Sequence, residues 1–234
     1  MVFQGSKRLI AKYIVPFIQK TIEENNVKYF YDMCVGGAHI IEQVQCENKI
    51  GGDINSNLIA LYNYALGNPQ WPKTITREDW NRAKDHPEEC EPWFVALVQY
   101  FASYSARGFS GGYCLNSERD HYGERLKNFQ RQLPLLKDCN FEVIDIIKWK
   151  CPNSGSCIYI DPPYQNTKKY DKINFDYEQF WDNIRKLSKD NYVFVSEQTA
   201  PDDFKAIWSK EVRRTVFGHK TSIATESLWT IKGD

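Results

Sequence analysis

Residues 157–164 read CIYIDPPY, and this stretch decides how the rest of the chain is interpreted. Its first four residues, 157–160, are a continuous apolar run of the kind found in strands that are buried on both faces. The two prolines that follow end the strand, because proline fixes its own backbone and has no N–H to donate. Asp161 and Tyr164 are therefore expected at the carboxyl end of a buried strand, where α/β proteins bind their ligands.

Short strands alternate with helical patterns on both sides of this stretch. The pattern predicts strands over 29–31, 49–53, 157–160 and 192–195. It predicts helices over 9–22, where Pro16 is a candidate kink or break, and over 58–65, 177–187 and 201–208. Two final β-like stretches, 212–217 and 227–231, are close enough in sequence to pair as a hairpin. This alternation predicts an α/β fold with a mostly parallel sheet and a C-terminal antiparallel hairpin.

The alternation stops between residues 69 and 140, where charged, aromatic and glycine residues are mixed. We therefore expect two regions. One is a domain made of residues 1–68 and 141–234, and the other is a helical insertion made of residues 69–140.

Composition limits the class of protein. Of the 234 residues 42% are hydrophobic and 15% aromatic, which is enough for a folded core. No apolar run approaches 18 residues and the N-terminus has no signal-peptide pattern, so we expect a cytoplasmic protein without a membrane partner. The seven cysteines form no C-x-x-C pair, so we expect reduced thiols and no metal. Thirty basic residues balance thirty acidic ones, which argues against coating a polyanion but allows a local basic groove.

The side chains of 161–164 suit one kind of substrate, an amino group on a flat ring. The Asp161 carboxylate and the Pro162 carbonyl are hydrogen-bond acceptors, and Tyr164 supplies a ring for stacking. Two acceptors that hold both amino hydrogens free the nitrogen lone pair, which then attacks an aligned electrophile. Gly36-Gly37 after the first strand and Asp53 at the end of the second indicate a nucleoside pocket. There is no complete G-x-G-x-x-G and no phosphate-binding loop after a strand, so dinucleotide and nucleoside-triphosphate sites are disfavoured.

Several blocks, in this order, resemble the Dam-type (D12 class) DNA adenine-N6 methyltransferases, including those of bacteriophages and prophages. The blocks are Phe3-Gln4-Gly5-Ser6-Lys7, Asp32-Met33-Cys34-Val35-Gly36-Gly37-Ala38, Gly52-Asp53-Ile54-Asn55-Ser56-Asn57-Leu58-Ile59, Asp161-Pro162-Pro163-Tyr164 and Ser196-Glu197-Gln198-Thr199-Ala200-Pro201. The resemblance implies a Rossmann-like S-adenosylmethionine-dependent methyltransferase fold. It implies that a methyl group passes directly from S-adenosylmethionine to N6 of an adenine flipped out of double-stranded DNA.

The resemblance also implies roles for individual residues. The catalytic residues are Asp161, Pro162 and Tyr164. The residues that contact S-adenosylmethionine are Phe3, Lys7, Asp32, Gly36, Gly37, Asp53 and Asp161. Met33, Cys34 and Ala38 replace a Pro, a Phe and a Gly of the family pattern, so we expect an effect on cofactor affinity more than on the chemistry.

The family places its target-recognition region where this chain has its insertion. Residues 99–137 hold six basic and three acidic side chains with aromatic residues between them, a composition that suits contacts to phosphates and to bases beside a flipped nucleotide. The predicted DNA contacts are Arg107, Arg119, Arg125, Arg131 and, just after the catalytic motif, Lys168.

Two alternatives stay open. The first is a cytosine-N4 methyltransferase, which also acts on a ring amino group, although its motif more often begins with Ser. The second is a catalytically inactive, DNA-binding relic of the fold, supported by Cys34 and Ala38. A cytosine-C5 enzyme is disfavoured because no Pro-Cys dipeptide supplies its nucleophile, and RNA or glutamine methylation because the motif begins with Asp161 rather than Asn. The recognition sequence, an accompanying restriction enzyme and the oligomeric state also stay open.

Overall fold

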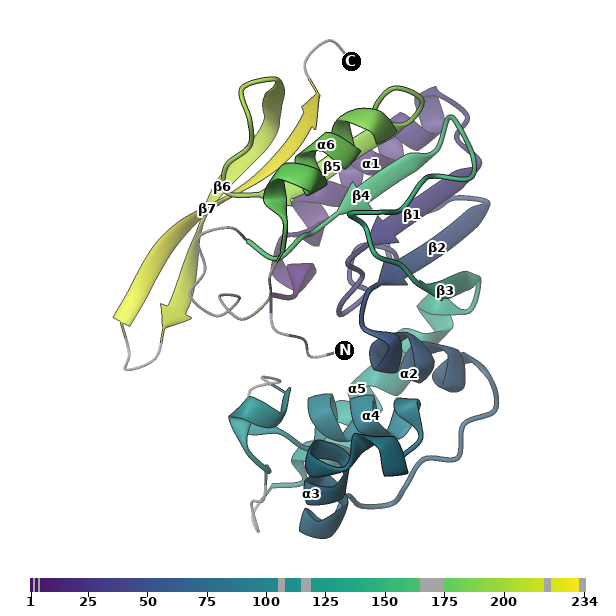
Figure 1. Cartoon of the computed structure of the whole chain (residues 1–234), viewed down its shortest axis with the longest axis vertical. Helices are drawn as coiled ribbons and strands as arrows, with labels where there is room; N and C mark the ends of the chain where they lie inside the picture. Colours follow the sequence, from purple (N-terminus) through teal and green to yellow (C-terminus); the bar gives the residue numbers. More distant parts are fainter. Residues whose placement is uncertain are drawn as a thin grey trace.

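The computed structural model describes residues 1, 3, 5–104, 108–114, 119–164, 175–216 and 220–231, with the side chains of 213–216 and 220–222 left out. The chain forms one seven-stranded sheet with helices on its faces and a helical part beyond one edge of the sheet (Figure 1).

The sheet has the strand order β3-β2-β1-β4-β5-β7-β6. Its strands are β1 (Tyr29–Met33), β2 (Asn48–Asp53), β3 (Cys139–Val143), β4 (Cys157–Ile160), β5 (Tyr192–Glu197), β6 (Phe204–Val216) and β7 (Lys220–Ile231). The pairs among β1 to β5 are parallel, whereas β7 runs antiparallel to both β5 and β6. The strand order reverses direction between β1 and β4, and in such sheets ligands bind at the carboxyl ends of the strands on either side of that point.

Helices cover both faces of the sheet. The helix α1 (Ala11–Glu24) lies behind it in Figure 1 and α6 (Tyr177–Leu187) lies in front. Side chains alternate along the buried strands, so Phe30 and Tyr159 pack into the core on the α1 side while Tyr31 and Ile160 pack into the core on the α6 side. The short 3₁₀ helix η1 (Lys7–Leu9) precedes α1 and lies near the carboxyl edge of the sheet.

The helical part follows α2 (Ser56–Leu66). It contains α3 (Arg77–Asp85), η2 (Pro87–Glu89), α4 (Pro92–Phe101), η4 (Gly108–Gly111) and α5 (His121–Leu136). Its aromatic side chains pack on one another, with Phe129 of α5 against Tyr62, Trp71 and Phe101. The chain then enters β3 directly, and this strand, which begins inside the 69–140 segment, was not predicted from the sequence.

Most of the predicted elements are confirmed. Residues 157–160 form β4, Asn55 caps α2 by accepting from the Leu58 backbone N–H, and Asp176 caps α6 by accepting from that of Gln179. Pro16 does not break α1, which runs through it. The Rossmann-like class, with its mostly parallel sheet and antiparallel C-terminal pair, is confirmed by the sheet order.

The helix predicted over 201–208 is wrong, because Phe204 begins the strand β6. The register of β6 against β7 shifts between Ala206 and Trp208, as in a β-bulge. The extra residue at a bulge interrupts the strict alternation of a strand, and Phe204, Ile207 and Trp208 then have the three-and-four spacing of a helix. The hairpin itself is confirmed, although it is longer than predicted and Val212 pairs with Ala224 rather than with a residue of 227–231.

None of the helices in the described part of the chain is long and apolar enough to cross a membrane.

The aromatic packing around Phe129 predicts its contribution to stability. Phe129 is 0% exposed, so Phe129→Ala should lower the free energy of unfolding by about 3–5 kcal/mol, measured by urea denaturation. Leu135→Ala on the same helix is the control, because Leu135 is 54% exposed and its truncation should change the free energy of unfolding by less than about 0.5 kcal/mol. Equal losses in the two variants would contradict the packing described here.

Candidate active site

The carboxyl ends of β1, β2 and β4 meet at one edge of the sheet. The backbone N–H of Asp161 donates to the Met33 carbonyl at 3.2 Å, and that of Val35 donates to the Gly52 carbonyl at 2.9 Å. These bonds tie the segment that follows each strand to the neighbouring strand. The loop after β1, residues 34–38, and the motif at 161–164 are therefore side by side, as the sequence predicts.

The loop after β1 needs left-handed backbone at Cys34 (φ +62°), Gly36 (φ +45°) and Ala38 (φ +58°). A Cβ at Gly36 would lie 2.9 Å from the Phe3 ring, so only glycine lets this ring lie against the loop. Left-handed backbone costs a non-glycine residue about 1–2 kcal/mol. Ala38 therefore keeps the conformation expected of the family's glycine at an energetic cost.

Two aspartates hold this loop in place. Asp53 at the end of β2 accepts backbone N–H bonds from Gly36 at 3.2 Å and Asn55 at 3.0 Å. Asp32 in β1 is 2% exposed and accepts from the Ile41 N–H at 3.0 Å. Burial raises the pKa of both carboxyl groups. Asp32 is therefore a buried acceptor for the segment that follows the loop, whereas Asp53 is half-buried at the strand end and accepts from the loop itself.

The predicted site residues Lys7 and Asp161 form a largely buried ion pair. The Lys7 Nζ lies 2.8 Å from the Asp161 Oδ1, with relative exposures of 8% and 18% for the two side chains. Lys7 is in η1, which begins after Ser6, whose hydroxyl accepts from the Arg8 backbone N–H. The N-terminal segment thus places Lys7 beside Asp161, at the end of β4.

Tyr164 and Glu226 complete a buried network around Lys7. Lys7 Nζ donates to the Tyr164 hydroxyl at 2.5 Å, and this hydroxyl donates to the Glu226 carboxylate. The same carboxylate lies 3.6 Å from Lys7 Nζ. Glu226 is on β7 and is 6% exposed, so the last strand of the chain supplies a buried acid to the site. Glu226 was not predicted from the sequence, where its one signal is an acidic side chain next to the β-like stretch 227–231.

The backbone carbonyls of the motif differ in their partners. The Tyr177 hydroxyl donates to the Pro163 carbonyl at 2.7 Å, which fixes the turn after β4. The Pro162 carbonyl accepts no hydrogen bond from any residue that the structure describes. An acceptor is thus available beside Asp161, where the sequence analysis placed the second amino hydrogen of the substrate.

Burial sets the protonation of Asp161. Desolvation raises the pKa of its carboxyl group to about 6, the Lys7 charge opposes this rise, and the Glu226 charge adds to it. Burial also raises the pKa of Tyr164 well above its ordinary value, so its hydroxyl stays protonated. At neutral pH Asp161 is an ionised acceptor with a proton affinity higher than that of an exposed aspartate.

The loop and its neighbours fit a nucleoside. Asp53 has one backbone hydrogen bond on each carboxylate oxygen and keeps acceptor capacity for ribose hydroxyls. The Phe3 ring lies against Gly36 and, at 5.1 Å between centroids, beside Tyr100 of α4. Tyr100 in turn accepts from Asn55 Nδ2 at 3.0 Å, so aromatic rings and acceptors face the same loop.

The predicted DNA contacts are placed differently. Arg107 and Lys168 lie outside the described residues. Arg119 is exposed and makes three hydrogen bonds to Glu124, and Arg125 donates to the backbone carbonyls of residues 100, 101 and 103. Arg131 is exposed. The Arg125 guanidinium therefore ties together the backbone at the end of α4, the Arg119 guanidinium pairs with Glu124 at the surface, and a role in DNA binding stays a prediction for all five residues.

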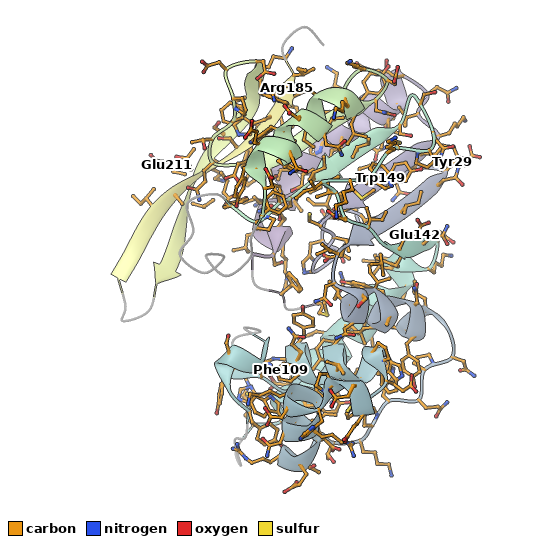
Figure 2. The ribbon with its side chains drawn as sticks, in the orientation of Figure 1. Tyr29, Phe109, Glu142, Trp149, Arg185 and Glu211 are labelled. Atoms are coloured by element: carbon orange, nitrogen blue, oxygen red, sulfur yellow. The ribbon has the colours of Figure 1, made fainter. Side chains whose placement is uncertain are left out.

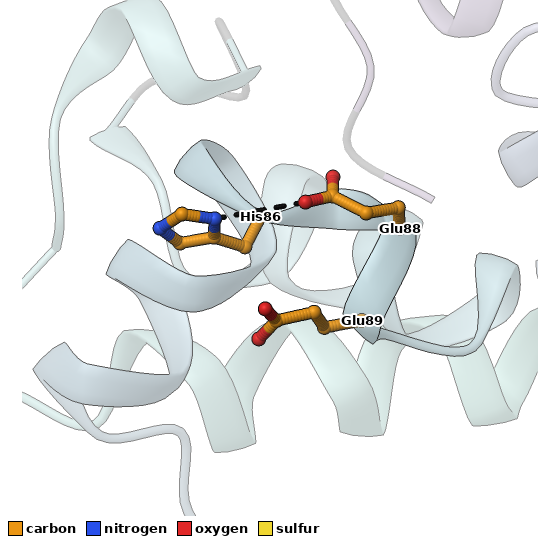
Figure 3. Close-up of side chains that lie close together, drawn as sticks. All are labelled: His86, Glu88 and Glu89. Atoms are coloured by element: carbon orange, nitrogen blue, oxygen red, sulfur yellow. Dashed lines mark ion pairs between the residues drawn. The ribbon is translucent and has the colours of Figure 1, made fainter.

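One group of possible metal ligands exists among the described residues, and it lies away from this edge of the sheet. His86, Glu88 and Glu89 follow α3, with 3.6 Å between His86 Nδ1 and Glu88 Oε1 (Figure 3). All three are exposed, and neighbouring exposed acids are common without an ion. We assign no metal to them.

Comparison with known families identifies the N-terminal part of the chain. Residues 3–102 match the model of the D12 class N6 adenine-specific DNA methyltransferases. The match confirms the predicted resemblance over these residues and with it the expected enzyme class, a DNA methyltransferase that acts on adenine N6. It includes the loop after β1 and Asp53, whereas residues 161–164 lie beyond it.

No curated protein sequence is similar enough to count as a match. Among solved structures, a provisionally assigned RNA methyltransferase from Pyrococcus horikoshii is 10% identical, with 92% of this chain and 79% of that chain covered and a TM-score of 0.40. TrmN from Thermus thermophilus is also 10% identical, with 97% and 53% covered and a TM-score of 0.38. TM-scores under 0.5 do not establish a common fold, so the fold rests on the sheet order described above.

The network around Lys7 predicts how Glu226 changes the pKa of Asp161. Glu226→Gln removes a negative charge that raises the pKa of Asp161, so this pKa should fall below about 6, measured by NMR titration of the Asp161 carboxyl carbon. Glu211→Gln is the matched control, because Glu211 is an exposed acid on the paired strand β6 and should leave the pKa of Asp161 unchanged. An unchanged or higher value in Glu226→Gln would contradict the network.

Proposed function

We propose that this chain transfers a methyl group from S-adenosylmethionine to adenine N6 in double-stranded DNA, with the adenine flipped into the site around Asp161. One observation carries the proposal beyond the family match. The buried Asp161 carboxylate and the Pro162 carbonyl lie at the end of β4, next to the loop that the family match covers.

The residues of the site form two groups, one that suits S-adenosylmethionine and one that suits the flipped adenine. Asp53, Gly36, Gly37 and Phe3 suit the nucleoside part of S-adenosylmethionine, which supplies an electrophilic methyl group. Asp32 fixes the segment that follows this loop, through its bond to the Ile41 N–H. Lys7 contacts the site through Asp161 and Tyr164.

The acceptors at 161 and 162 orient the adenine amino group. Asp161 accepts one amino hydrogen and the Pro162 carbonyl accepts the other, while the Tyr164 ring stacks on the base. A carboxylate has about four lone-pair positions, so Asp161 can keep Lys7 and still accept from N6. Its pKa of about 6 also suits it to accept the proton that N6 releases after transfer and to pass this proton to water.

The helical part, with the 69–140 boundaries predicted from the sequence, is proposed as the target-recognition region. It lies beyond the sheet on the side of β2 and β3, and its helix α5 leads directly into β3 (Figure 1). A duplex held between this part and the sheet would present its flipped base to β4. A bacterial or phage-infected cytoplasm, where such DNA is found, stays the predicted location.

The first experiment is nucleoside mass spectrometry of unmethylated duplex DNA after incubation with the protein and S-adenosylmethionine. We expect N6-methyladenine from the wild type and a decrease in kcat of about 10²–10³-fold in Asp161→Asn, the range for losing one preorganised polar partner. Asp202→Asn is the control, since Asp202 is exposed and should leave kcat unchanged.

Each other outcome has a definite meaning. Formation of N4-methylcytosine would support the same direct transfer, with cytosine instead of adenine as the target base. Duplex binding without any methylated base would support the inactive relic and overturn the proposal. Full turnover in Asp161→Asn would remove Asp161 from the chemistry.

The pKa of Asp161 predicts the pH dependence of the reaction. The ionised carboxylate is the stronger acceptor for the amino hydrogen and the form that takes up the N6 proton, so kcat/KM should fall as the pH drops through about 6. The measurement is the acid limb of kcat/KM between pH 5 and 8, taken with saturating S-adenosylmethionine. A flat profile down to pH 5 would show that ionised Asp161 is not required.

A further inference from the structure

A basic and aromatic surface lies on α1 and β6, and it includes none of the DNA contacts predicted from the sequence. It is centred on the half-exposed Tyr13 of α1, whose ring is stacked on Trp208 of β6 at 5.8 Å and 17°. The Lys210 Nζ lies 3.8 Å from the centre of the Tyr13 ring, and the Lys12 Nζ lies 5.0 Å from it. We call these four residues the Tyr13 surface.

The two lysines of the Tyr13 surface lack an acidic partner. Both are exposed, and neither forms an ion pair with any carboxylate in the described part of the chain. Glu211 is next to Lys210 in β6, but successive strand residues point to opposite faces. A hydrogen bond with Lys210 and the charge of Lys12 lower the pKa of the Tyr13 hydroxyl, which reflects the local positive potential.

The start of α1 adds to this potential. Lys12 is in the first turn of the helix, where a positive side chain opposes the helix dipole. The residue at the N-cap, Ile10, makes no side-chain cap, and the first turn has no acidic residue. Two exposed ammonium groups and a helix start without a side-chain cap thus lie beside the same aromatic ring.

The Tyr13 surface adjoins the candidate active site. Lys210 of β6 is paired directly with Glu226 of β7, the buried acid that contacts Lys7. Paired residues of antiparallel strands have their Cβ atoms about 5 Å apart. Figure 1 shows the β6–β7 hairpin continuing past the rest of the sheet from this point, and Figure 2 labels Glu211 there.

We propose that the Tyr13 surface binds the phosphate backbone of duplex DNA beside the flipped adenine, with Lys12 and Lys210 each contacting a phosphate. This inference rests on the proposed function, because the partner is the DNA that reaches Asp161. Lysine contacts to phosphate position a duplex without reading its sequence. The Tyr13 surface would then hold the duplex from the hairpin side, whereas the helical part would hold it from the other.

The test compares the double variant Lys12→Gln/Lys210→Gln with wild type in duplex-DNA binding at several salt concentrations. Each phosphate contact contributes about 0.9 to the slope of log Kd against log salt, so the slope should fall by about 1.8. Because neither lysine touches the reacting atoms, KM for DNA should rise while kcat at saturating DNA and the Kd of S-adenosylmethionine stay unchanged.

The matched control is Lys20→Gln/Lys189→Gln, which removes the same two charges. Lys20 is farther along α1 and Lys189 follows α6, and both are exposed. The control should keep the wild-type slope, and thermal unfolding should be the same for all three proteins.

The outcomes separate this inference from the proposed function. An unchanged slope in the double variant, in a wild type that methylates DNA, overturns the Tyr13 surface and leaves the methylation intact. A lower slope in the double variant, with no methyl product from wild type, supports the Tyr13 surface as a duplex-binding site and overturns the activity. Tighter binding of an RNA duplex, with the same loss in the double variant, would assign the surface to RNA and overturn the proposal.

Discussion

The ion pair between Lys7 and Asp161 is the interaction on which the site depends. Asp161 lies at the end of a buried strand, and desolvation alone would favour its neutral form. Lys7 opposes this by placing a positive charge 2.8 Å away, which keeps the carboxylate ionised at neutral pH. The lysine is itself buried, and its charge is balanced by Glu226 and the Tyr164 hydroxyl. A buried charge without such partners costs several kcal/mol, so the four groups are stable only together.

The backbone groups of the loop after β1, residues 34–38, also have specific hydrogen-bond partners. Asp53 accepts from the Gly36 N–H, the Tyr62 hydroxyl donates to the Gly36 carbonyl, and Gln132 of α5 donates to the Gly37 carbonyl. The strand β2 and the helices α2 and α5 thus each bind one backbone group of the loop. The left-handed conformation of Ala38 persists because these contacts fix its surroundings.

Local patterns in the sequence were enough to predict much of this structure. The apolar run before Asp161 predicted β4, and the helical spacing of apolar residues over 58–65 and 177–187 predicted α2 and α6, because both patterns repeat within a few neighbouring residues. Lys7 and Asp161 were assigned to one site by their resemblance to a family, and the structure places them in contact. These signals involve either neighbouring residues or a recurrent motif.

The features that were missed depend on strand register. Glu226 reaches the site only through the pairing of β7 with β5 and β6, and the helical spacing of Phe204, Ile207 and Trp208 concealed a bulge in β6. Arg119 and Arg125 look available in the sequence, yet each guanidinium is used inside the helical part. The carbonyl of residue 100 that Arg125 binds is 25 residues away along the chain, and no local pattern reports it.

The assembly of the site also has a consequence for synthesis on the ribosome. Lys7 and Tyr164 are 157 residues apart, and Tyr164 and Glu226 are a further 62 residues apart. Translation completes β4 and releases Asp161 well before it makes β7, and domains generally begin to fold from the N-terminal side. Until β7 has emerged from the ribosomal tunnel, a nascent chain has the Lys7–Asp161 ion pair but not Glu226, the third charged group of the network. Among the strands of this sheet β7 is therefore the last to be made, and it completes a site whose first charged residue, Lys7, precedes every strand.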